Sequence, residues 1–382
     1  MARRPRILVI GAGIIGTSIA WRLASRGASV TVIEAGQPGA GTTDTSLAWV
    51  NASSKLDSSR EYFDLAVRAT AEHHTLADAL GETRYFFPSG HIEISRESGE
   101  ADRLRSKVAR LQKSGYYAQL IGVRDLRRLE PGIRLPATAV AASYPDEGWV
   151  DGPAMARGLL ERARGSGAKV LSHTTATHVA LRDDVVTGAH VAPGKLVGAD
   201  TVVIATGRWT QDFLARLRVD VPLTDVAGKD SQAVGVLVSV LPRGGAPRTV
   251  VHSPKVNWAP RASGRAVLAS AGADRAIARD RSPEVLGTIA GALLKRAADL
   301  SARFAEARIE RTHIGLRALP MDRRPVCGWI NSIDGLYVVV THSGITLAPL
   351  LSRLVAEEIL DGVEARLLRP FRPSRFDSAA TS

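Results

Sequence analysis

Three glycines near the amino terminus have the spacing of a turn that approaches a phosphate group. Gly11, Gly13 and Gly16 follow an apolar run and open a segment with helical periodicity. Gly11 would make the tight turn, Gly13 would let the backbone approach a pyrophosphate, and Gly16 would let the helix pack against the strand. The helix that begins at Ile14 and Ile15 would then point its unpaired N–H groups at the phosphates.

An acidic residue completes this pattern. The apolar residues 30–33 end in Glu34, 18 residues beyond Gly16, and Ala35 follows. The Glu34 carboxylate would accept hydrogen bonds from a ribose diol and would repel a 2′-phosphate, so the pattern favours FAD or NAD over NADP. A plain structural glycine turn is the alternative. The strand, the helix and the acid are all in place, which favours the nucleotide.

Length and composition indicate a globular protein of two domains. A chain of 382 residues is longer than a domain with a single hydrophobic core usually is. Its content of 45% hydrophobic and 23% charged residues is typical of a globular protein. The formal net charge of +12 comes mostly from arginines scattered along the sequence. A diffuse charge argues against a nucleic-acid groove, and it is compatible with anionic substrates or with peripheral contact to an acidic membrane surface.

The number and spacing of cysteines and histidines argue against a disulfide and a metal site. Cys327 is the single cysteine, so no internal disulfide can form and a reducing compartment is expected. The basic start resembles a secretory signal, but the same residues are needed for the first strand and turn, so a cytoplasmic protein is expected. No apolar run approaches the ~20 residues of a membrane span. The nine histidines are scattered singly, and no metal site is expected.

Periodicity predicts an α/β protein in which a Rossmann-like domain is joined to a mainly antiparallel one. Strands without intervening helices near 170–197 predict an antiparallel layer on the nucleotide domain. The last residues, 377–382, are expected to be mobile. Helices are expected at 60–80, 99–114, 123–130, after an N-cap at Asp151, and at 283–304 and 346–360. Strands are expected at 86–94, 170–171, 178–181, 185–191, 196–197, 201–204, 233–240, 249–252, 266–269 and 335–340.

Further motifs follow in a fixed order along the chain. They are Gly-Thr-Thr at 41–43 with Ser46, Val-Val-Ile-Ala-Thr-Gly at 202–207, Gly-Leu-Arg-Ala-Leu-Pro at 315–320, Arg-Pro-Val-Cys-Gly at 324–328 and His-Ser-Gly-Ile-Thr at 342–346. Together with the first glycine turn, they resemble the D-amino acid oxidase-like family of FAD-dependent oxidoreductases, which includes glycine oxidase, sarcosine oxidase and D-amino acid dehydrogenase. The resemblance is weak across 86–145 and 220–305.

The resemblance implies a discontinuous FAD-binding domain and a substrate domain. The FAD-binding domain would comprise 1–85, 146–220 and 310–375, and the substrate domain 86–145 and 221–309. The residues implied at the cofactor, besides those of the first motif, are Thr42, Thr43, Ser46, Ala48, Trp49, Val179, Ala205, Thr206, Gly207, Trp209, Arg317, His342, Ser343, Gly344, Ile345 and Thr346.

The resemblance implies that different residues contact different parts of the FAD molecule. Thr42 and Thr43 would donate to the pyrophosphate, with an ordinary loop as the alternative. Ala48 and Trp49 would lie along the flavin edge. Val179 would meet the adenine through its backbone, or act only as a core valine.

At the other end of the cofactor, the helix N-terminus at 343–346 would face the pyrimidine end of the ring. His342 lacks the glycine that commonly precedes it and has either a flavin contact or a packing role. Cys327 is displaced from the place of a linking cysteine, so noncovalent FAD and a buried, inert thiol are expected.

The substrate residues are also carried by the resemblance. Arg317 would hold a substrate carboxylate in a bidentate grip, with a structural ion pair as the alternative. Asn257 and Trp258 stand where the family often offers a tyrosine; the indole would suit an apolar substrate, or would serve inter-strand packing. Lys255 is a weak candidate for assisting the reaction of reduced flavin with oxygen. Arg323 and Arg324 are assigned to the surface.

The expected activity is oxidation of an amino acid or secondary amine by an FAD-dependent enzyme. Hydride would pass from the amine-bearing carbon to flavin N5 and leave an imine. One alternative is a biosynthetic flavin oxidoreductase acting on a larger amine or a ring. Another is a membrane-docked dehydrogenase that passes electrons to a quinone or protein instead of oxygen. A homo-oligomer is compatible with the sequence, and no nucleic-acid partner is expected.

Overall fold

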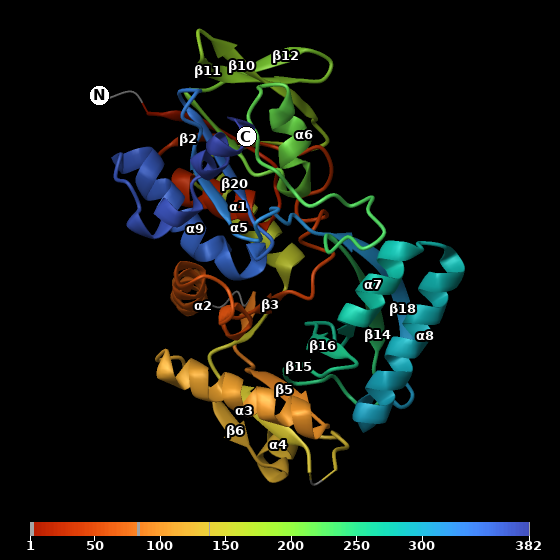
Figure 1. The fold of residues 1–382 in the computed structure, drawn as a ribbon. Helices are drawn as coiled ribbons and strands as arrows, with labels where there is room; N and C mark the ends of the chain where they lie inside the picture. Colours follow the sequence, from red (N-terminus) through yellow and green to blue (C-terminus); the bar gives the residue numbers. More distant parts are fainter. Residues whose placement is uncertain (1–3, 82–84, 137, 382) are drawn as a thin grey trace. The chain divides into compact units, whose positions relative to one another are not determined.

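The computed structural model describes residues 4–81, 85–136 and 138–381. The chain forms two compact units, each built from separate stretches of sequence (Figure 1). Unit 1 comprises Met1–Asp44, Gly152–Thr224 and Arg317–Ser382, and unit 2 comprises Thr45–Asp151 and Asp225–Leu316. The sequence placed 45–85 with the nucleotide domain, whereas these residues belong to unit 2. Backbone N–H groups of this segment bond to the Glu147 carboxylate of the same unit.

Unit 1 is built on a six-stranded sheet in the order β19-β20-β13-β1-β2-β9, parallel except for β19. A three-stranded antiparallel sheet, β10-β11-β12, belongs to the same unit. The strands are β1 Arg6–Ile10, β2 Ser29–Ile33, β9 Lys169–Leu171, β10 Ala176–Arg182, β11 Val185–Val191, β12 Lys195–Gly198, β13 Thr201–Ile204, β19 Val326–Trp329 and β20 Leu336–Val340. The helices are α1 Ile14–Ser25, α5 Gly152–Gly165, α6 Thr210–Ala215 and α9 Gly344–Asp361, with 3-10 turns η2 Gly207–Trp209, η4 Arg366–Phe371 and η5 Pro373–Thr381.

The two faces of this sheet are covered by different layers. Leu8 and Ile10 of β1 share a core cluster with Val179 and Ala189 of the antiparallel sheet. Because neighbouring side chains of a strand point to opposite faces, Val9 faces the other way, toward the side covered by α1. Helix α1 in turn packs against α5 and α9. The expected antiparallel layer on the nucleotide domain is confirmed.

Unit 2 is built on an eight-stranded sheet in the order β18-β14-β17-β16-β15-β5-β7-β6, in which only the β15–β5 pair is parallel. A small sheet, β3-β8-β4, accompanies it. The strands are β3 Trp49–Val50, β4 Phe86–Phe87, β5 His91–Ser95, β6 Gln119–Ile121, β7 Val140–Tyr144, β8 Gly148–Val150, β14 Val234–Leu241, β15 Val250–His252, β16 Asn257–Pro260, β17 Ala266–Ala269 and β18 Arg308–Leu316. The helices are α2 Arg60–Leu80, α3 Ser98–Lys113, α4 Val123–Leu129, α7 Ala271–Arg279 and α8 Pro283–Leu300, with 3-10 turns η1 Ser53–Lys55 and η3 Ala302–Phe304.

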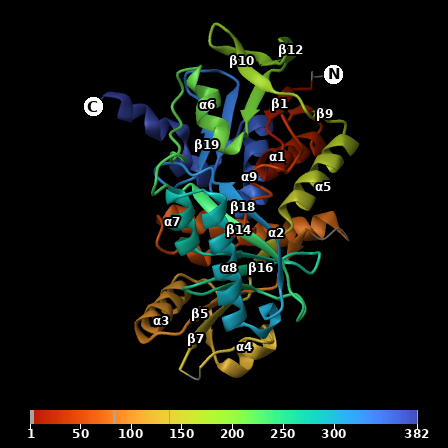
Figure 2. The same ribbon diagram turned by 90° about the vertical axis from the view of Figure 1, so that its right-hand side faces the viewer.

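Helices α7 and α8 lie along β14 and β18 (Figures 1 and 2), and their apolar faces join the core of this sheet. Helix α8 begins where the side chain of Ser282 accepts a hydrogen bond from the N–H of Val285, with Pro283 in the first turn. It ends at Leu300 and not at 304 as predicted. Ser301 adopts an extended conformation there and caps the short turn η3.

One other expectation differs in detail. The strand expected at 86–94 is divided into β4 and β5. The turn η5 extends to Thr381, and residue 382 lies outside the described residues. Within the described part of the chain, no helix combines the length and the apolar character needed to cross a membrane.

Candidate cofactor and substrate sites

The first glycine turn leaves no room for side chains at two of its positions. Gly11 has a φ of 100°, and a Cβ atom there would lie 2.5 Å from the carbonyl oxygen of Ala205. A Cβ atom at Gly16 would lie 1.9 Å from the carbonyl oxygen of Gly11. Only glycine can bring the turn, the helix and the neighbouring strand β13 this close together.

Gly13 has a different environment, because it is the N-cap of α1 and lacks a side chain that could cap the helix. Thr43 takes over part of this task, since its Oγ1 accepts the N–H of Ile14 at 3.0 Å. The hydroxyl proton of Thr43 remains available to a ligand. Thr43 is buried, and Thr42 and Ile15 are half-buried. This helix terminus combines backbone donors with a hydroxyl donor, as a pyrophosphate requires.

The Glu34 carboxylate is fixed just beyond the end of β2. Its Oε2 accepts the N–H of Ala12 at 2.8 Å, and its Oε1 accepts the N–H of Gly36 at 2.8 Å. Each carboxylate oxygen can accept a second hydrogen bond, so a ribose diol can still be held. Ala35, next to Glu34, is exposed. The residues at this end of the turn fit an adenine nucleotide.

The start of helix α9 lies against the start of α1. A Cβ atom at Gly344 would lie 3.6 Å from Cγ1 of Ile15. Ser343 is the N-cap of α9, and Ile345 and Thr346 are buried. Two positive helix ends therefore face the same region of unit 1, and such ends stabilise negative charge. His342, just before this turn, is exposed.

The turn after β13 adjoins the glycine turn. Ala205 donates its N–H to the carbonyl of Ile10 at 2.9 Å. Thr206 bonds Thr210 through their hydroxyls at 3.1 Å, and Gly207 has a φ of 59°. β1 and β13 are neighbouring parallel strands, and ligands of such sheets bind beyond the carboxyl ends of the strands.

Two further expected cofactor residues of unit 1 have contrasting surroundings. The ring of Trp209 is 53% exposed and would lie 3.6 Å from a Cβ atom at Gly41, so it stands beside the Gly-Thr-Thr loop. Val179 is buried in the core cluster of the antiparallel sheet. Its side chain therefore has the packing role, which leaves only its backbone for an adenine.

The expected flavin-edge segment belongs to unit 2, and its backbone is firmly held. The hydroxyl of Ser46 accepts the N–H of Ala48 at 2.9 Å. The Arg261 guanidinium donates to the carbonyls of Ser46 at 2.7 Å and Leu47 at 3.3 Å. Ala48 has a φ of 55°, a conformation that costs a non-glycine residue energy and persists where the surroundings enforce it. This shape presents Trp49 at the start of β3.

Trp49 belongs to a buried polar cluster that sequence reasoning missed. Its indole Nε1 donates to Oε2 of Glu147 at 3.0 Å. Its ring centroid lies 4.5 Å from that of His91 and 4.1 Å from that of His252. His91 and His252 meet because β5 and β15 pair side by side. No local sequence signal marks this cluster, since the two histidines are 161 residues apart.

Glu147 is the centre of this cluster and is completely buried. Its Oε1 accepts the N–H of Ala52 at 3.1 Å, the N–H of Ser53 at 2.8 Å and the hydroxyl of Tyr116 at 2.8 Å. Burial raises the pKa of Glu147, and these hydrogen bonds oppose that effect. Burial and the neighbouring carboxylate raise the pKa of Tyr116, so the phenol stays protonated and acts as a donor.

The residues of unit 2 that were expected at the substrate have the following surroundings. Trp258 has no exposed surface and packs against Phe304 with ring centroids 5.1 Å apart. The Oδ1 of Asn257 accepts the N–H of Ser253 at 3.2 Å and closes the turn before β16. Lys255 is exposed. Arg317 is half-buried and directly follows β18.

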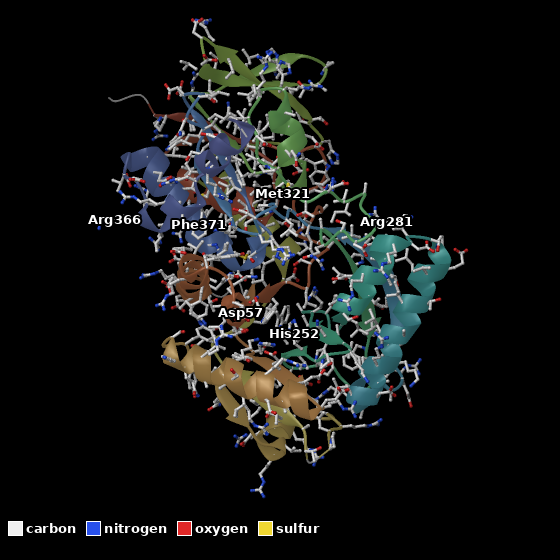
Figure 3. All side chains as sticks on the ribbon, viewed as in Figure 1. Asp57, His252, Arg281, Met321, Arg366 and Phe371 are labelled. Atoms are coloured by element: carbon white, nitrogen blue, oxygen red, sulfur yellow. The ribbon has the colours of Figure 1, made fainter. Side chains whose placement is uncertain are left out.

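Two expectations concern the segment around Cys327. The assignment of Arg324 to the surface is wrong: its Nη2 donates to the carbonyl of Pro370 at 2.8 Å, and its guanidinium lies 5.5 Å from the ring of Phe371, labelled in Figure 3. The carboxyl-terminal turn η4 packs against Arg324, and no local sequence pattern predicts this contact. Arg323 is exposed, as expected. Cys327 is buried, as expected, and burial raises its pKa to about 12.

Comparison with known proteins agrees with this architecture. The family model described as FAD dependent oxidoreductase, DAO, matches residues 6–358. Glycine oxidase of Geobacillus kaustophilus is 27% identical over 383 residues, with 98% of each chain covered. Its crystal structure superposes with a TM-score of 0.79 at 25% identity, covering 97% of this chain and 99% of that one.

A second relative matches only part of the chain. Monomeric sarcosine oxidase of Bacillus sp. (strain B-0618) is 26% identical over 229 residues, covering 57% of this chain and 55% of its own. The glycine turn, the anchored Glu34 and the start of α1, whose N-cap Gly13 has no side chain, fit the adenine dinucleotide of an FAD-dependent family. The chain belongs to the DAO family of FAD-dependent oxidoreductases and is an enzyme that uses FAD.

Proposed function

We propose that this enzyme oxidises a small amino acid or a secondary amine that carries a carboxylate. The proposal is supported by two relatives, named glycine oxidase and monomeric sarcosine oxidase, and by Arg317 in the Gly-Leu-Arg sequence after β18. In the proposed site Arg317 grips the substrate carboxylate in a bidentate pair, which fixes the amine-bearing carbon. Bound FAD supplies the hydride acceptor at its N5 atom, and the oxidised substrate leaves as an imine.

Other residues of the chain hold the cofactor in this proposal. Thr43 and the N-terminus of α1 bind the pyrophosphate, and Glu34 binds the adenosine ribose. The start of α9 at Ser343 stabilises negative charge on the pyrimidine end of the flavin. The cofactor is held noncovalently, since Cys327 is buried within unit 1.

The role of Arg317 carries the substrate proposal and can be tested directly. The holoenzyme is screened for flavin bleaching under anaerobic conditions with a panel of amino acids and N-methyl amino acids. With an active substrate, Arg317→Lys and Arg317→Ala are expected to lower kcat/KM by 30-fold or more, because loss of a charged bidentate pair costs about 2–5 kcal/mol. Arg366→Ala is a matched control, since Arg366 is an exposed arginine, labelled in Figure 3.

The outcomes of this test are distinct. An unchanged KM and kcat for Arg317→Ala would show that the carboxylate is bound elsewhere. A holoenzyme that no amine or amino acid bleaches would contradict the proposed reaction as a whole. The electron acceptor is proposed to be oxygen, supported by the relatives named oxidases, and is tested by peroxide formation under air. Faster turnover with an artificial quinone, without peroxide, would favour a dehydrogenase.

A further inference from the structure

One edge of the eight-stranded sheet in unit 2 concentrates large apolar side chains on its surface. Eight such residues are exposed in the described part of the chain, and three of them are Tyr117, Leu120 and Leu129. They are 55%, 46% and 36% exposed. The other five are spread over unit 1. Single exposed apolar residues are ordinary, whereas a group of them indicates a contact surface.

This segment surrounds β6, an edge strand that pairs only with β7. Helix α3 covers one face of the sheet beside it, since Leu104 of α3 shares a core cluster with Ala142 of β7. Helix α4 covers the opposite face, where Leu126 shares a cluster with Ala141. Strand β6 therefore reaches the surface between two helices (Figure 1).

A cavity of about 480 Å³ connects β6 with α4. Leu120 of β6 and Leu129 of α4 both line it, and Gln119 and Ser143 add polar groups. Arg128 lines it as well. The two exposed leucines therefore belong to one concave surface, although they come from different elements.

Basic side chains stand around these apolar residues. Arg124 and Arg127 of α4 and Lys113 at the end of α3 are exposed. None of these three has a hydrogen bond or ion pair within the part of the chain that the structure describes. Arg128 differs, because it donates to Asp125 at 3.0 Å.

We call this region the β6 surface. It combines uncompensated positive charge with exposed apolar groups, and its members are Lys113, Tyr117, Leu120, Arg124, Arg127 and Leu129.

The chemistry of the β6 surface selects among possible partners. A further β-strand finds little to pair with, because β6 has only 3 residues and offers few backbone hydrogen bonds. A single-stranded nucleic acid is held by aromatic platforms that stack its bases, and exposed leucines do not provide them. An acidic membrane surface matches both properties. Its phosphates attract the cations, and its interface takes up apolar and tyrosine side chains.

We infer that the β6 surface docks this protein peripherally on membranes that contain acidic phospholipids. Its cations face the lipid phosphates, and its leucines and tyrosine enter the headgroup region. Such contact is reversible, since it combines electrostatic attraction with shallow burial of apolar groups. The inference concerns unit 2 by itself and does not depend on the substrate of the enzyme.

Sedimentation of the holoenzyme with vesicles tests the docking. One set of vesicles contains phosphatidylcholine alone, and the other contains equal parts of phosphatidylcholine and phosphatidylglycerol. Binding is expected only to the acidic set, and it should weaken between ~0.1 M and ~1 M salt because screening shortens the range of the attraction. No binding to acidic vesicles, or equal binding to both sets, would overturn the inference.

The charged part of the surface is tested by the double variant Arg124→Gln/Arg127→Gln. It is expected to lower the vesicle partition coefficient ~30-fold, which corresponds to about 1 kcal/mol for each basic residue. Arg216→Gln/Arg218→Gln is the matched control, because it removes the same charge from two exposed arginines of unit 1. Equal losses in both double variants would show that only the overall charge of the protein matters, and would refute the β6 surface.

The apolar part is tested by Leu120→Ser/Leu129→Ser. A loss of ~10-fold in binding to acidic vesicles is expected, because less apolar surface enters the lipid interface. Val185→Ser/Leu196→Ser is the control, since both residues are exposed and belong to unit 1. Far-UV circular dichroism confirms that each variant is folded. Unchanged binding by the folded leucine variant would contradict the inference.

A fluorescent label locates the contact and remains decisive if the leucine double variant does not fold. Cys327 is the single cysteine and is buried, so a cysteine introduced by Leu120→Cys can be labelled selectively. A polarity-sensitive fluorophore at this position is expected to brighten and shift to the blue with acidic vesicles. The same label on Leu196→Cys should not respond. Unchanged emission at position 120 in sedimenting protein would place the contact elsewhere and overturn the inference.

A competing partner and the proposed reaction are both distinguished by these measurements. Tighter binding of an RNA oligonucleotide than of acidic vesicles, lost in Arg124→Gln/Arg127→Gln, would identify a nucleic-acid surface instead. All vesicle measurements are made without substrate. Their failure therefore leaves amine oxidation untouched, and a holoenzyme that no amine bleaches leaves the docking result intact.

Discussion

Replacement of Glu147 by leucine or by glutamine tests how much stability comes from the hydrogen bonds that this buried carboxylate accepts. Leucine fills a similar volume without an acceptor. It strands Trp49 Nε1, the N–H groups of Ala52 and Ser53, and the Tyr116 hydroxyl. Each buried donor left unsatisfied costs about 1–3 kcal/mol, so Glu147→Leu is expected to cost ~4–12 kcal/mol, less whatever water can recover. This loss is comparable to the total stability of a typical domain, ~5–15 kcal/mol.

Glutamine is expected to cost far less. Its amide oxygen keeps the three hydrogen bonds at the Oε1 position, and only the Trp49 indole N–H is stranded. The expected loss is ~1–3 kcal/mol. Trp49→Phe removes that donor, so Glu147→Gln should cost less in the Trp49→Phe background than in the wild type.

Chemical denaturation of the apoprotein, followed by far-UV circular dichroism and intrinsic fluorescence, measures these losses. Coincidence of the two transitions tests whether unfolding is two-state. Equal losses for leucine and glutamine, or a leucine variant within ~1 kcal/mol of the wild type, would refute the hydrogen-bond assignment at Glu147. A double-mutant cycle without coupling between Trp49 and Glu147 would refute the indole contact.

Three further outcomes are expected. Gly13→Ala adds a Cβ atom 3.4 Å from Thr43 Oγ1, so it should weaken FAD binding by 10-fold or more, measured by flavin fluorescence, and leave the apoprotein nearly as stable. Gly16→Ala places a Cβ atom 1.9 Å from a carbonyl oxygen, so it should destabilise the apoprotein itself by ~1–3 kcal/mol. Burial raises the pKa of Cys327 from 9 to about 12, so the thiol loses its proton at lower pH in the unfolded chain than in the folded one. The contribution of this thiol to stability is therefore complete below pH 9 and is lost as the pH rises toward 12. In urea titrations, the free energy of unfolding of Cys327→Ser should fall less steeply with rising pH than that of the wild type. Arg372→Met leaves Glu358, 2% exposed, without the guanidinium that donates to it at 2.9 Å, and should cost ~3–5 kcal/mol by denaturation; a loss below ~1 kcal/mol would contradict this pairing.

The nucleotide-binding part of the fold could be predicted because its information is local. Gly11, Gly16 and Glu34 lie within one strand, one helix and the next strand, and the glycines are required by contacts that any such turn makes. The order of the later motifs then identified the family without any alignment. Element boundaries shifted where a single residue left the helix, as at Ser301.

The buried cluster of unit 2 could not be predicted, since its members come from distant strands. Glu147 and Trp49 are 98 residues apart, and His91 and His252 are 161 apart. Their meeting depends on the pairing of β5 with β15, for which the sequence has no local code. The burial of Trp258 was open to prediction, because alternation along β16 decides which face of the sheet a side chain takes.

The division of unit 1 among three stretches of sequence has a consequence for its synthesis on the ribosome. In the sheet, strand β20 pairs with one edge of β13, and β19 pairs with the far edge of β20. Both strands are nevertheless translated more than a hundred residues after β13. Until they emerge, β13 has an open edge of apolar residues, a template for wrong pairing with other chains. Nascent chains halted before residue 326 should therefore depend on chaperones that hold this edge apart.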